Sequence, residues 1–173
     1  YGAALVRAGR YAEAVEKLQE HAKLDGANNN LINLLATAQR RSGQRAAAAE
    51  TLKTALARVD ARGRTALTLE LAETYEELGR NDDALAQYEQ ILDGLTAKGS
   101  LSEQSEGLFN HVAGKVARLC RRTGNQARLQ ALLTRARKVI DEQNPLIETL
   151  TIEGLREEGK RREALEPTRA ALR

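Results

Sequence analysis

Apolar residues recur at intervals of three and four positions throughout the chain, which is the spacing that places them on one face of an α-helix. In the clearest stretch, 68–92, Leu71 and Tyr75 belong to one such face and Tyr88 belongs to a second. The polar turn 79–82 separates the two faces. This pattern predicts a hairpin of two amphipathic helices, and a single hairpin needs similar neighbours because it buries little apolar surface alone.

A repeated motif supplies those neighbours: a glycine is followed five residues later by a small or apolar residue. The copies are Gly9 with Ala14, Gly43 with Ala48, Gly79 with Ala84, Gly124 with Leu129, and Gly159 with Ala164. Successive glycines are 34, 36, 45 and 35 residues apart. We expect each glycine to end a helix in a conformation that a Cβ atom disfavours. We expect the residue five positions after each glycine to be buried where two helices cross. In the first four copies a large apolar residue follows it four positions later: Leu18, Leu52, Tyr88 or Leu133.

These patterns predict an all-α fold of about five helical hairpins that form an α-α superhelix, in a single domain spanning 1–173. The expected units are approximately 1–28, 29–63, 64–99, 100–143 and 144–173. The expected helices are 1–8, 11–24, 30–42, 45–59, 64–78, 81–97, 102–122, 125–142, 145–158 and 161–172.

Several residues predict where the later helices begin or bend. Ser100 and Glu103 have the spacing of a capping box. Asn144 before Pro145 is typical of a helix start, and Pro167 should kink or shorten the last helix. The helix expected at 102–122 is about two turns longer than its counterparts, which explains most of the 45-residue spacing.

The third unit resembles the tetratricopeptide repeat (TPR) family, and the resemblance extends over nearly the whole chain. The family's pattern positions are occupied by Thr68, Leu71, Ala72, Tyr75, Gly79, Ala84 and Tyr88 in this unit. In the first unit they are occupied by Gly2, Leu5, Gly9, Tyr11, Ala14 and Leu18. The chain departs from the pattern in having no tryptophan, few late prolines and a stretched fourth unit, and another α-solenoid is the main competing fold. The resemblance implies a right-handed superhelix whose first helices line a concave surface for extended peptides or partner helices.

Transferring the family's groove positions to this chain gives a set of candidate binding residues on the first helices. The set is Asn33, Thr37, Arg40, Leu69, Glu73, Glu76, His111, Arg118, Arg121, Glu153 and Arg156. One interpretation is a mixed-charge peptide groove in which arginines bind carboxylates through two parallel hydrogen bonds. The other is that Arg40, Glu76 and Arg121 pair with one another between helices about 8–10 Å apart. Some TPR domains bind a chain-terminal carboxylate with lysine and asparagine side chains on the first helices of adjacent repeats. This chain does not reproduce that clamp, because Leu69 and Glu73 occupy the matching positions of the third unit.

Few residues suggest catalysis or metal binding. Cys120 occupies an apolar position and is expected to be a small buried residue, and His21 is expected to pack against its neighbours. The two histidines are far apart in sequence, whereas a helical zinc site needs two of them four residues apart. The sequence contains no glycine-rich phosphate loop and no nucleophile motif. We therefore predict no enzymatic activity, no metal site and no cofactor.

The function predicted from these observations is a scaffold that binds another protein or peptide in its groove. The net charge of +3 is small for a nucleic-acid-binding surface, so nucleic acid is the less favoured partner. A nucleic-acid-binding helical repeat therefore stays open as an alternative, as does a helper region of a larger enzyme or secretion machine. Self-association through an end of the solenoid is a further hypothesis, because Leu165 and Leu172 lie near the end of the chain.

The sequence does not identify a cellular compartment. No apolar run is long enough to span a membrane, so we expect a soluble chain, with the cytoplasm slightly favoured. The chain begins at Tyr1 and contains no methionine, so we interpret it as a piece of a longer protein. A signal peptide removed before residue 1 is compatible with the same sequence.

Overall fold

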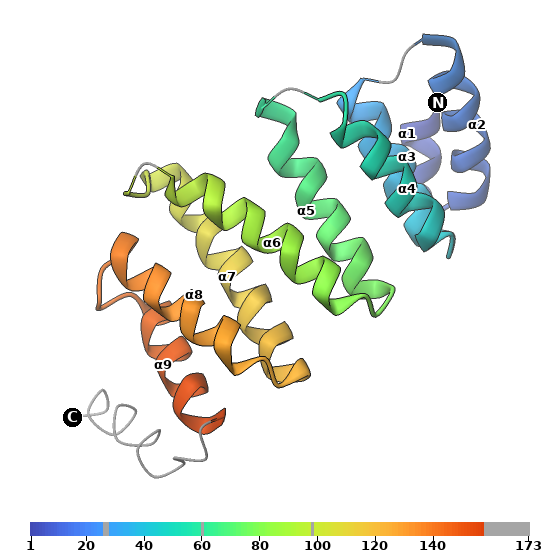
Figure 1. Ribbon diagram of the computed structural model, residues 1–173. Helices are drawn as coiled ribbons and strands as arrows, with labels where there is room; N and C mark the ends of the chain where they lie inside the picture. The colour runs from blue at the N-terminus through green and yellow to red at the C-terminus, as the bar shows by residue number, and fades with distance from the viewer. Residues whose placement is uncertain (26–27, 60, 98, 158–173) are drawn as a thin grey trace. The chain divides into compact units, whose positions relative to one another are not determined.

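The computed structural model describes residues 1–25, 28–59, 61–97 and 99–157, and within them it contains nine α-helices and no β-strand (Figure 1). The helices are α1 (Gly2–Arg7), α2 (Tyr11–Asp25), α3 (Asn29–Arg41), α4 (Arg45–Leu56), α5 (Ala61–Glu77), α6 (Asn81–Thr96), α7 (Glu103–Thr123), α8 (Gln126–Val139) and α9 (Pro145–Glu157). The all-α prediction is confirmed. The predicted helix 161–172 and its Pro167 lie outside the described residues.

The contacts divide the chain into two compact units, Tyr1–Gln87 and Tyr88–Arg173, so that α6 contributes to both. The expected single domain and its five unit boundaries stay predictions. In the first unit, α1 packs against α2, and α3 against α4, as helical hairpins. In the second unit, α7 and α8 form the corresponding hairpin, and α9 packs against both of them.

The same turn ends the first helix of each described hairpin. The residue after the glycine donates its backbone N–H to the carbonyl five positions earlier: Arg10 to Leu5, Gln44 to Gln39, Arg80 to Tyr75 and Asn125 to Cys120, at 2.9, 2.8, 2.9 and 2.8 Å. This bond is possible because the glycine adopts a positive φ, as in Gly124 at +68°. The predicted role of these glycines is confirmed for four of the five copies, and Gly159 lies outside the described residues.

The residues predicted at the helix crossings are buried. Ala14, Ala48 and Ala84 are each 0% exposed, and Leu129 is 1% exposed. The large apolar residues four positions later are also buried: Leu18, Leu52, Tyr88 and Leu133. A small residue at the crossing lets two helices approach closely, and the large residue one turn later fills the space beside it. This pairing explains why the motif recurs with each hairpin.

The helix boundaries differ from the prediction by three residues at the end of α4, the start of α5 and the end of α8. α5 begins at Ala61 rather than at residue 64, because Ala61 and Arg62 are strong helix formers. The capping box predicted for Ser100 and Glu103 is wrong, since the Ser102 N–H donates to Ser105 Oγ at 2.9 Å instead. Two other predictions are confirmed: Asn144 Oδ1 accepts from the Leu146 N–H at 2.9 Å, and α7 has 21 residues against 13 in α3.

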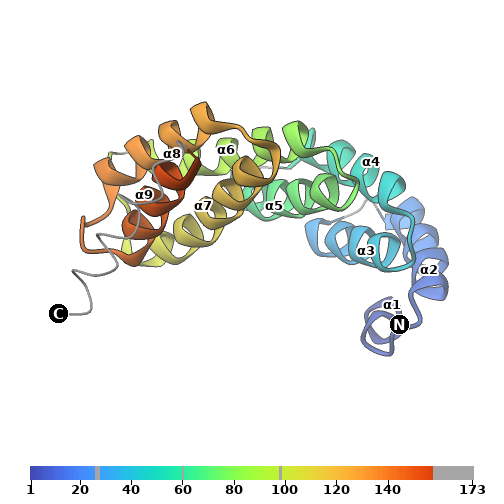
Figure 2. The same cartoon turned by 90° about the horizontal axis from the view of Figure 1, so that it is seen from below.

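The first helices of neighbouring hairpins contact one another directly. In the first unit α3 packs against both α1 and α5, and Figure 2 shows α3 and α5 on one side of this unit with α4 on the other. In the second unit α7 packs against α9 in the same way. Each unit therefore has a layer of first helices, and the sides of these helices that do not pack against the second helices are available for a partner.

Two glycines at different positions along α7 should respond oppositely to alanine. At Gly124 the positive φ disfavours a Cβ atom, so Gly124→Ala should lower the free energy of unfolding by about 1 kcal/mol. At Gly114 a Cβ atom would meet nothing within 4 Å, so Gly114→Ala should raise it by about 0.5–1 kcal/mol. Urea denaturation followed by circular dichroism measures both, and equal effects of the two substitutions would contradict the assigned turn.

Candidate functional site

The predicted binding residues lie on the first helices, as their positions in the sequence require. In the first unit, Asn33, Thr37 and Arg40 are on α3, and Leu69, Glu73 and Glu76 are on α5. All six are partly exposed. In the second unit, His111, Arg118 and Arg121 are on α7 and are exposed. Glu153 and Arg156 belong to α9, but their side chains lie outside the described part of the chain.

Arg40 is the centre of the charged cluster in the first unit. Its side chain is only 11% exposed, and Nη1 donates to Glu70 Oε2 at 2.9 Å and to Glu73 Oε2 at 3.3 Å. Arg40 Nε lies 3.4 Å from Glu77 Oε1, which is a contact between charges rather than a hydrogen bond. Arg45 Nε donates to the second oxygen of Glu77 at 3.1 Å. One arginine of α3 therefore faces three carboxylates of α5.

This cluster supports the interpretation that charges pair between adjacent helices, but with different partners for Arg40. Glu70 and Glu77, which were not among the predicted site residues, are partners of Arg40 together with Glu73. Helical spacing is the signal that could have found them, because positions 70 and 77 are three residues before and four residues after Glu73 on one face of α5.

The environment of Glu70 is electrostatically unfavourable for its ionised form. Burial raises the pKa of the Glu70 carboxyl above 4.5, Arg40 opposes this effect, and the carboxylates of Glu73 and Glu77 add to it. A carboxyl with a raised pKa in the folded state favours folding most at low pH. That contribution is lost as the pH rises through the raised pKa.

We therefore expect Glu70→Gln to be more stable than the parent at pH 7 and equal to it below pH about 4. The neutral amide avoids the unfavourable ionisation and still offers an oxygen to Arg40. Urea denaturation of both proteins between pH 4 and pH 8 measures the difference. A variant that is less stable at pH 7 would show that the ion pair with Arg40 outweighs the effect of burial.

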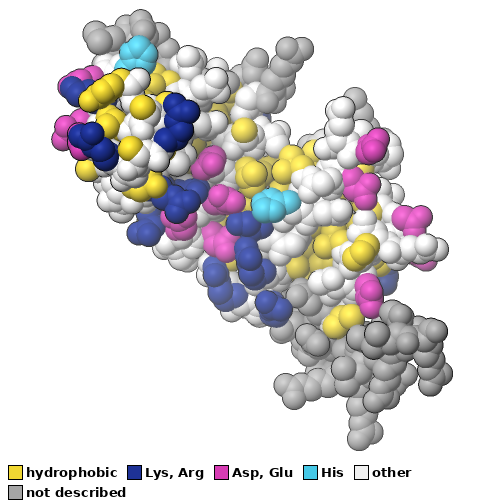
Figure 3. All heavy atoms as spheres, turned by 180° about the vertical axis from the view of Figure 1, so that it is seen from behind, with side chains coloured by type: hydrophobic (Ala, Val, Ile, Leu, Met, Phe, Trp, Pro, Cys, Tyr) yellow, Lys and Arg dark blue, Asp and Glu magenta, His cyan; other side chains and the backbone are white. Residues whose placement is uncertain are grey.

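A basic surface follows one face of α7 in the second unit. His111, Lys115, Arg118 and Arg122 follow one another at spacings of four, three and four residues, and Arg121 adjoins them. Figure 3 shows basic side chains gathered next to a histidine on the exposed surface. Lys115 and Arg122 were not among the predicted site residues. The last turn of α7 carries Arg121 and Arg122, where positive charge complements the helix dipole.

The buried carbonyl of Asn33 adds a polar feature to the layer of first helices. Its Oδ1 atom is buried and accepts no hydrogen bond within the part of the chain that the structure describes. A buried acceptor normally has a hydrogen-bond partner, either in the protein or in ordered water.

The cysteine and the histidines are the residues that could suggest catalysis. Cys120 is buried as predicted, and burial raises the pKa of its thiol to about 11, which disfavours the nucleophilic thiolate at neutral pH. The prediction that His21 packs is wrong, because its side chain is exposed on α2. Within the described ranges, no three His, Cys, Asp or Glu side chains are grouped to hold a metal ion, and no helix could span a membrane.

Comparison with solved structures places the chain among α-helical repeat proteins. A candidate kinesin light chain from Podosopora anserina with nearly identical TPR-like repeats is 22% identical and has a TM-score of 0.67 over 95% of this chain and 87% of that one. The C-terminal part of a TPR repeat-containing protein from Cytophaga hutchinsonii is 16% identical, with a TM-score of 0.65 over 95% and 59%. MamA MSR-1 is 18% identical, with a TM-score of 0.62 over 95% and 86%. At these identities the likeness concerns the fold.

One stretch of the sequence matches a family model. Residues 66–101 match the family model described as the tetratricopeptide repeat, and they include the unit with the clearest pattern. The chain therefore contains a tetratricopeptide repeat at these residues, and its described part has the fold of a TPR-like helical-repeat protein. No curated protein sequence matches the chain significantly. Proteins built from such repeats are scaffolds that generally carry no catalytic site and typically mediate protein–protein interaction.

Proposed function

We propose that this chain binds another protein through the exposed sides of its first helices and performs no chemistry of its own. The observation that carries the proposal is the layer of first helices, in which α3 packs against α5 and leaves side chains of both helices partly exposed. Thr37 and Leu69 on the same layer of helices are partly exposed and would add a polar and an apolar contact.

The charges of the first helices differ between the two units, and each unit favours a partner segment of its own charge. In the first unit α5 carries Glu70, Glu73, Glu76 and Glu77, and in the second unit α7 carries an exposed basic face. Arg40 is engaged by carboxylates of its own chain, so it positions the acidic side chains of α5 rather than offering its guanidinium to a ligand. A segment with lysine or arginine would meet the glutamates of α5 in the first unit, and the α7 face of the second unit suits aspartate or glutamate.

Two matched substitutions test which side of the first unit binds. Ala66 on α5 and Ala47 on α4 are both exposed alanines within helices, so an arginine at either position leaves the core unchanged. We expect Ala66→Arg to reduce capture of the partner from the source cell at least tenfold, because the long side chain covers the layer of first helices. Ala47→Arg should leave capture unchanged. Loss of capture with Ala47→Arg alone would place the binding surface on the second helices.

The basic face of α7 favours nucleic acid as a second candidate partner. Four positive side chains along one helix provide phosphate contacts, and affinity would then fall steeply with salt concentration. The face lacks aromatic side chains on which bases could stack, and among the described residues Tyr1 is the only large exposed hydrophobic residue. Capture that persists after nuclease treatment, with an affinity that changes little with salt concentration, would favour a protein partner over nucleic acid.

A further inference from the structure

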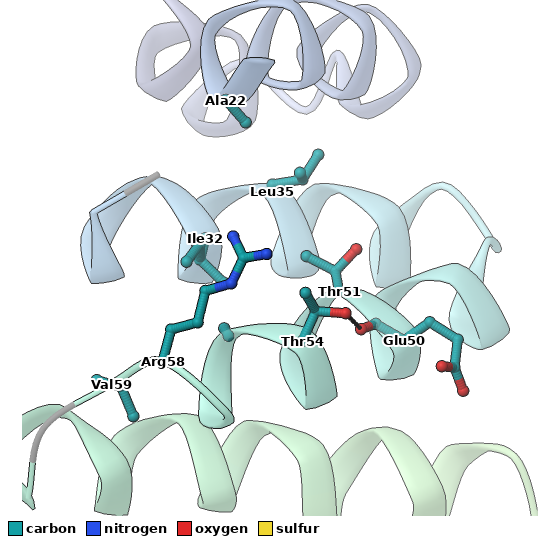
Figure 4. A pocket seen from close by; sticks show the side chains of 9 residues that line it. Ala22, Ile32, Leu35, Glu50, Thr51, Thr54, Arg58 and Val59 are labelled. Atoms are coloured by element: carbon teal, nitrogen blue, oxygen red, sulfur yellow. Dashed lines mark hydrogen bonds between the residues drawn. The ribbon is translucent and has the colours of Figure 1, made fainter. Parts of the chain in front are cut away.

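A cavity of about 440 Å³ lies on a different side of α3 from the proposed binding surface. Its apolar walls come from α2, α3 and α4 and from the segment that follows α4. The apolar lining residues are Ala22, Ile32, Leu35, Ala55 and Val59 (Figure 4). Positions 32 and 35 project from a different face of α3 than positions 33, 37 and 40. A cavity of this size is within the range of small-molecule sites, which are largely apolar with a few polar groups.

The polar groups of the cavity include one cation directed into it. Arg58 follows the end of α4, and Figure 4 shows its guanidinium reaching between Ile32 and Thr51 toward Leu35. Within the described residues, this guanidinium forms no hydrogen bond or ion pair. Glu50 also lines the cavity, but Figure 4 shows its carboxylate pointing away from Arg58, and it pairs with Lys53 at 3.0 Å. Among the side chains that the structure describes, the cavity therefore presents a positive charge without an acidic residue directed at it.

The two threonines of the cavity have their hydroxyl protons engaged. Thr51 Oγ1 donates to Gln39 Oε1 at 2.9 Å, and Thr54 Oγ1 donates to the Glu50 carbonyl at 2.9 Å. These hydroxyl groups can therefore accept hydrogen bonds from a ligand but cannot donate one to an anion. Arg58 is then the group that determines which ligand charge the cavity favours. A planar guanidinium matches a carboxylate with two parallel hydrogen bonds, whereas a doubly charged phosphate usually needs several cations.

We propose that this cavity binds a small aliphatic carboxylate. The carboxylate lies against the Arg58 guanidinium, and the hydrocarbon chain lies against Ile32, Leu35 and Ala55. Burial of the chain supplies affinity, and the arginine selects an anion over a neutral or cationic molecule of the same length. The site is separate from the proposed protein-binding surface, so either proposal can fail without the other.

Sodium octanoate is the probe, with 1-octanol and octylammonium as ligands of the same chain length. Titration calorimetry of the parent chain should show saturable octanoate binding, at least tenfold tighter than that of either control. Amide shifts in ¹⁵N NMR spectra should change at Ile32, Leu35, Thr51 and Thr54. Arg58→Gln should weaken octanoate binding about tenfold, which corresponds to about 1.4 kcal/mol. Arg7→Gln, which removes an exposed arginine of α1, should not weaken it.

A second variant tests the cavity independently of the charge. Thr54 is exposed on α4, so Thr54→Leu should leave the fold intact, fill the entrance and abolish octanoate binding. Equal affinities of the parent and Arg58→Gln would overturn the proposal, as would tighter binding of octanol than octanoate. Shift changes confined to residues outside the cavity, or no saturable binding, would overturn it as well.

Discussion

Phe109→Ala should lower the free energy of unfolding by about 3–5 kcal/mol, the range observed when a buried aromatic side chain is truncated. Phe109 is the only phenylalanine of the chain and is 0% exposed within α7. α7 packs against α8 and α9, so the cavity left by the ring would weaken the centre of the second unit. In a fold held by contacts between neighbouring repeats, the loss of stability should be largest in the helices that adjoin α7.

The neighbouring residue Leu108 provides the control for this prediction. Its side chain is partly exposed on the same helix, and Leu108→Ala should cost only about 1 kcal/mol. Urea denaturation measures both free energies, and hydrogen exchange shows which amides lose protection. Equal costs for the two alanine substitutions would contradict the assignment of Phe109 to the core.

Arg40→Met should lower the free energy of unfolding by about 2 kcal/mol at pH 7. The substitution keeps an unbranched side chain but leaves the carboxylates of Glu70, Glu73 and Glu77 without their shared cation. Removing one partner of a buried ion pair costs about 3–5 kcal/mol, and we expect less here because solvent reaches the three glutamates. Part of the loss should disappear near pH 4, because burial raises the pKa of Glu70 and its protonation removes one of the negative charges.

Arg45→Met is the matched control for Arg40→Met. Arg45 is 46% exposed and pairs with Glu77 alone, so its removal should cost less than about 1 kcal/mol at either pH. The double variant Arg40→Met/Glu70→Gln should be more stable at pH 7 than Arg40→Met, because it contains one negative charge fewer. A loss for Arg40→Met that is the same at pH 4 and pH 7 would assign its effect to packing.

The repeat architecture could be predicted from the sequence because it depends on backbone requirements that few residues satisfy. Gly79 is needed where φ is positive, and Ala84 is needed where two helices cross at 0% exposure. The glycine recurs in each of the four described hairpins and the alanine in three of them, so the pattern was visible without any knowledge of side-chain positions. The start of α5 was harder to predict, because Gly63 indicates a loop although the residues before it favour a helix.

The partners of charged side chains could be predicted only in part. The pairing of Arg40 with α5 follows from the packing of neighbouring first helices, but the choice of Glu70 and Glu77 depends on how α5 is rotated about its axis. Spacing within one helix does not determine that rotation. The exposure of His21 was missed for a similar reason, since its position on α2 does not reveal which neighbours reach it. The cavity beside Arg58 depends on three helices and had no signal in the sequence.

Photo-crosslinking from single positions tests the proposed binding surface most directly. A benzoylphenylalanine is placed at Ala66 on α5 in one protein and at Ala47 on α4 in another, and each is irradiated in extract of the source cell. Both positions are exposed, so both reagents are equally accessible before a partner binds. The account predicts a protein adduct from position 66 and none above background from position 47. An adduct from position 47 alone would contradict binding through the first helices.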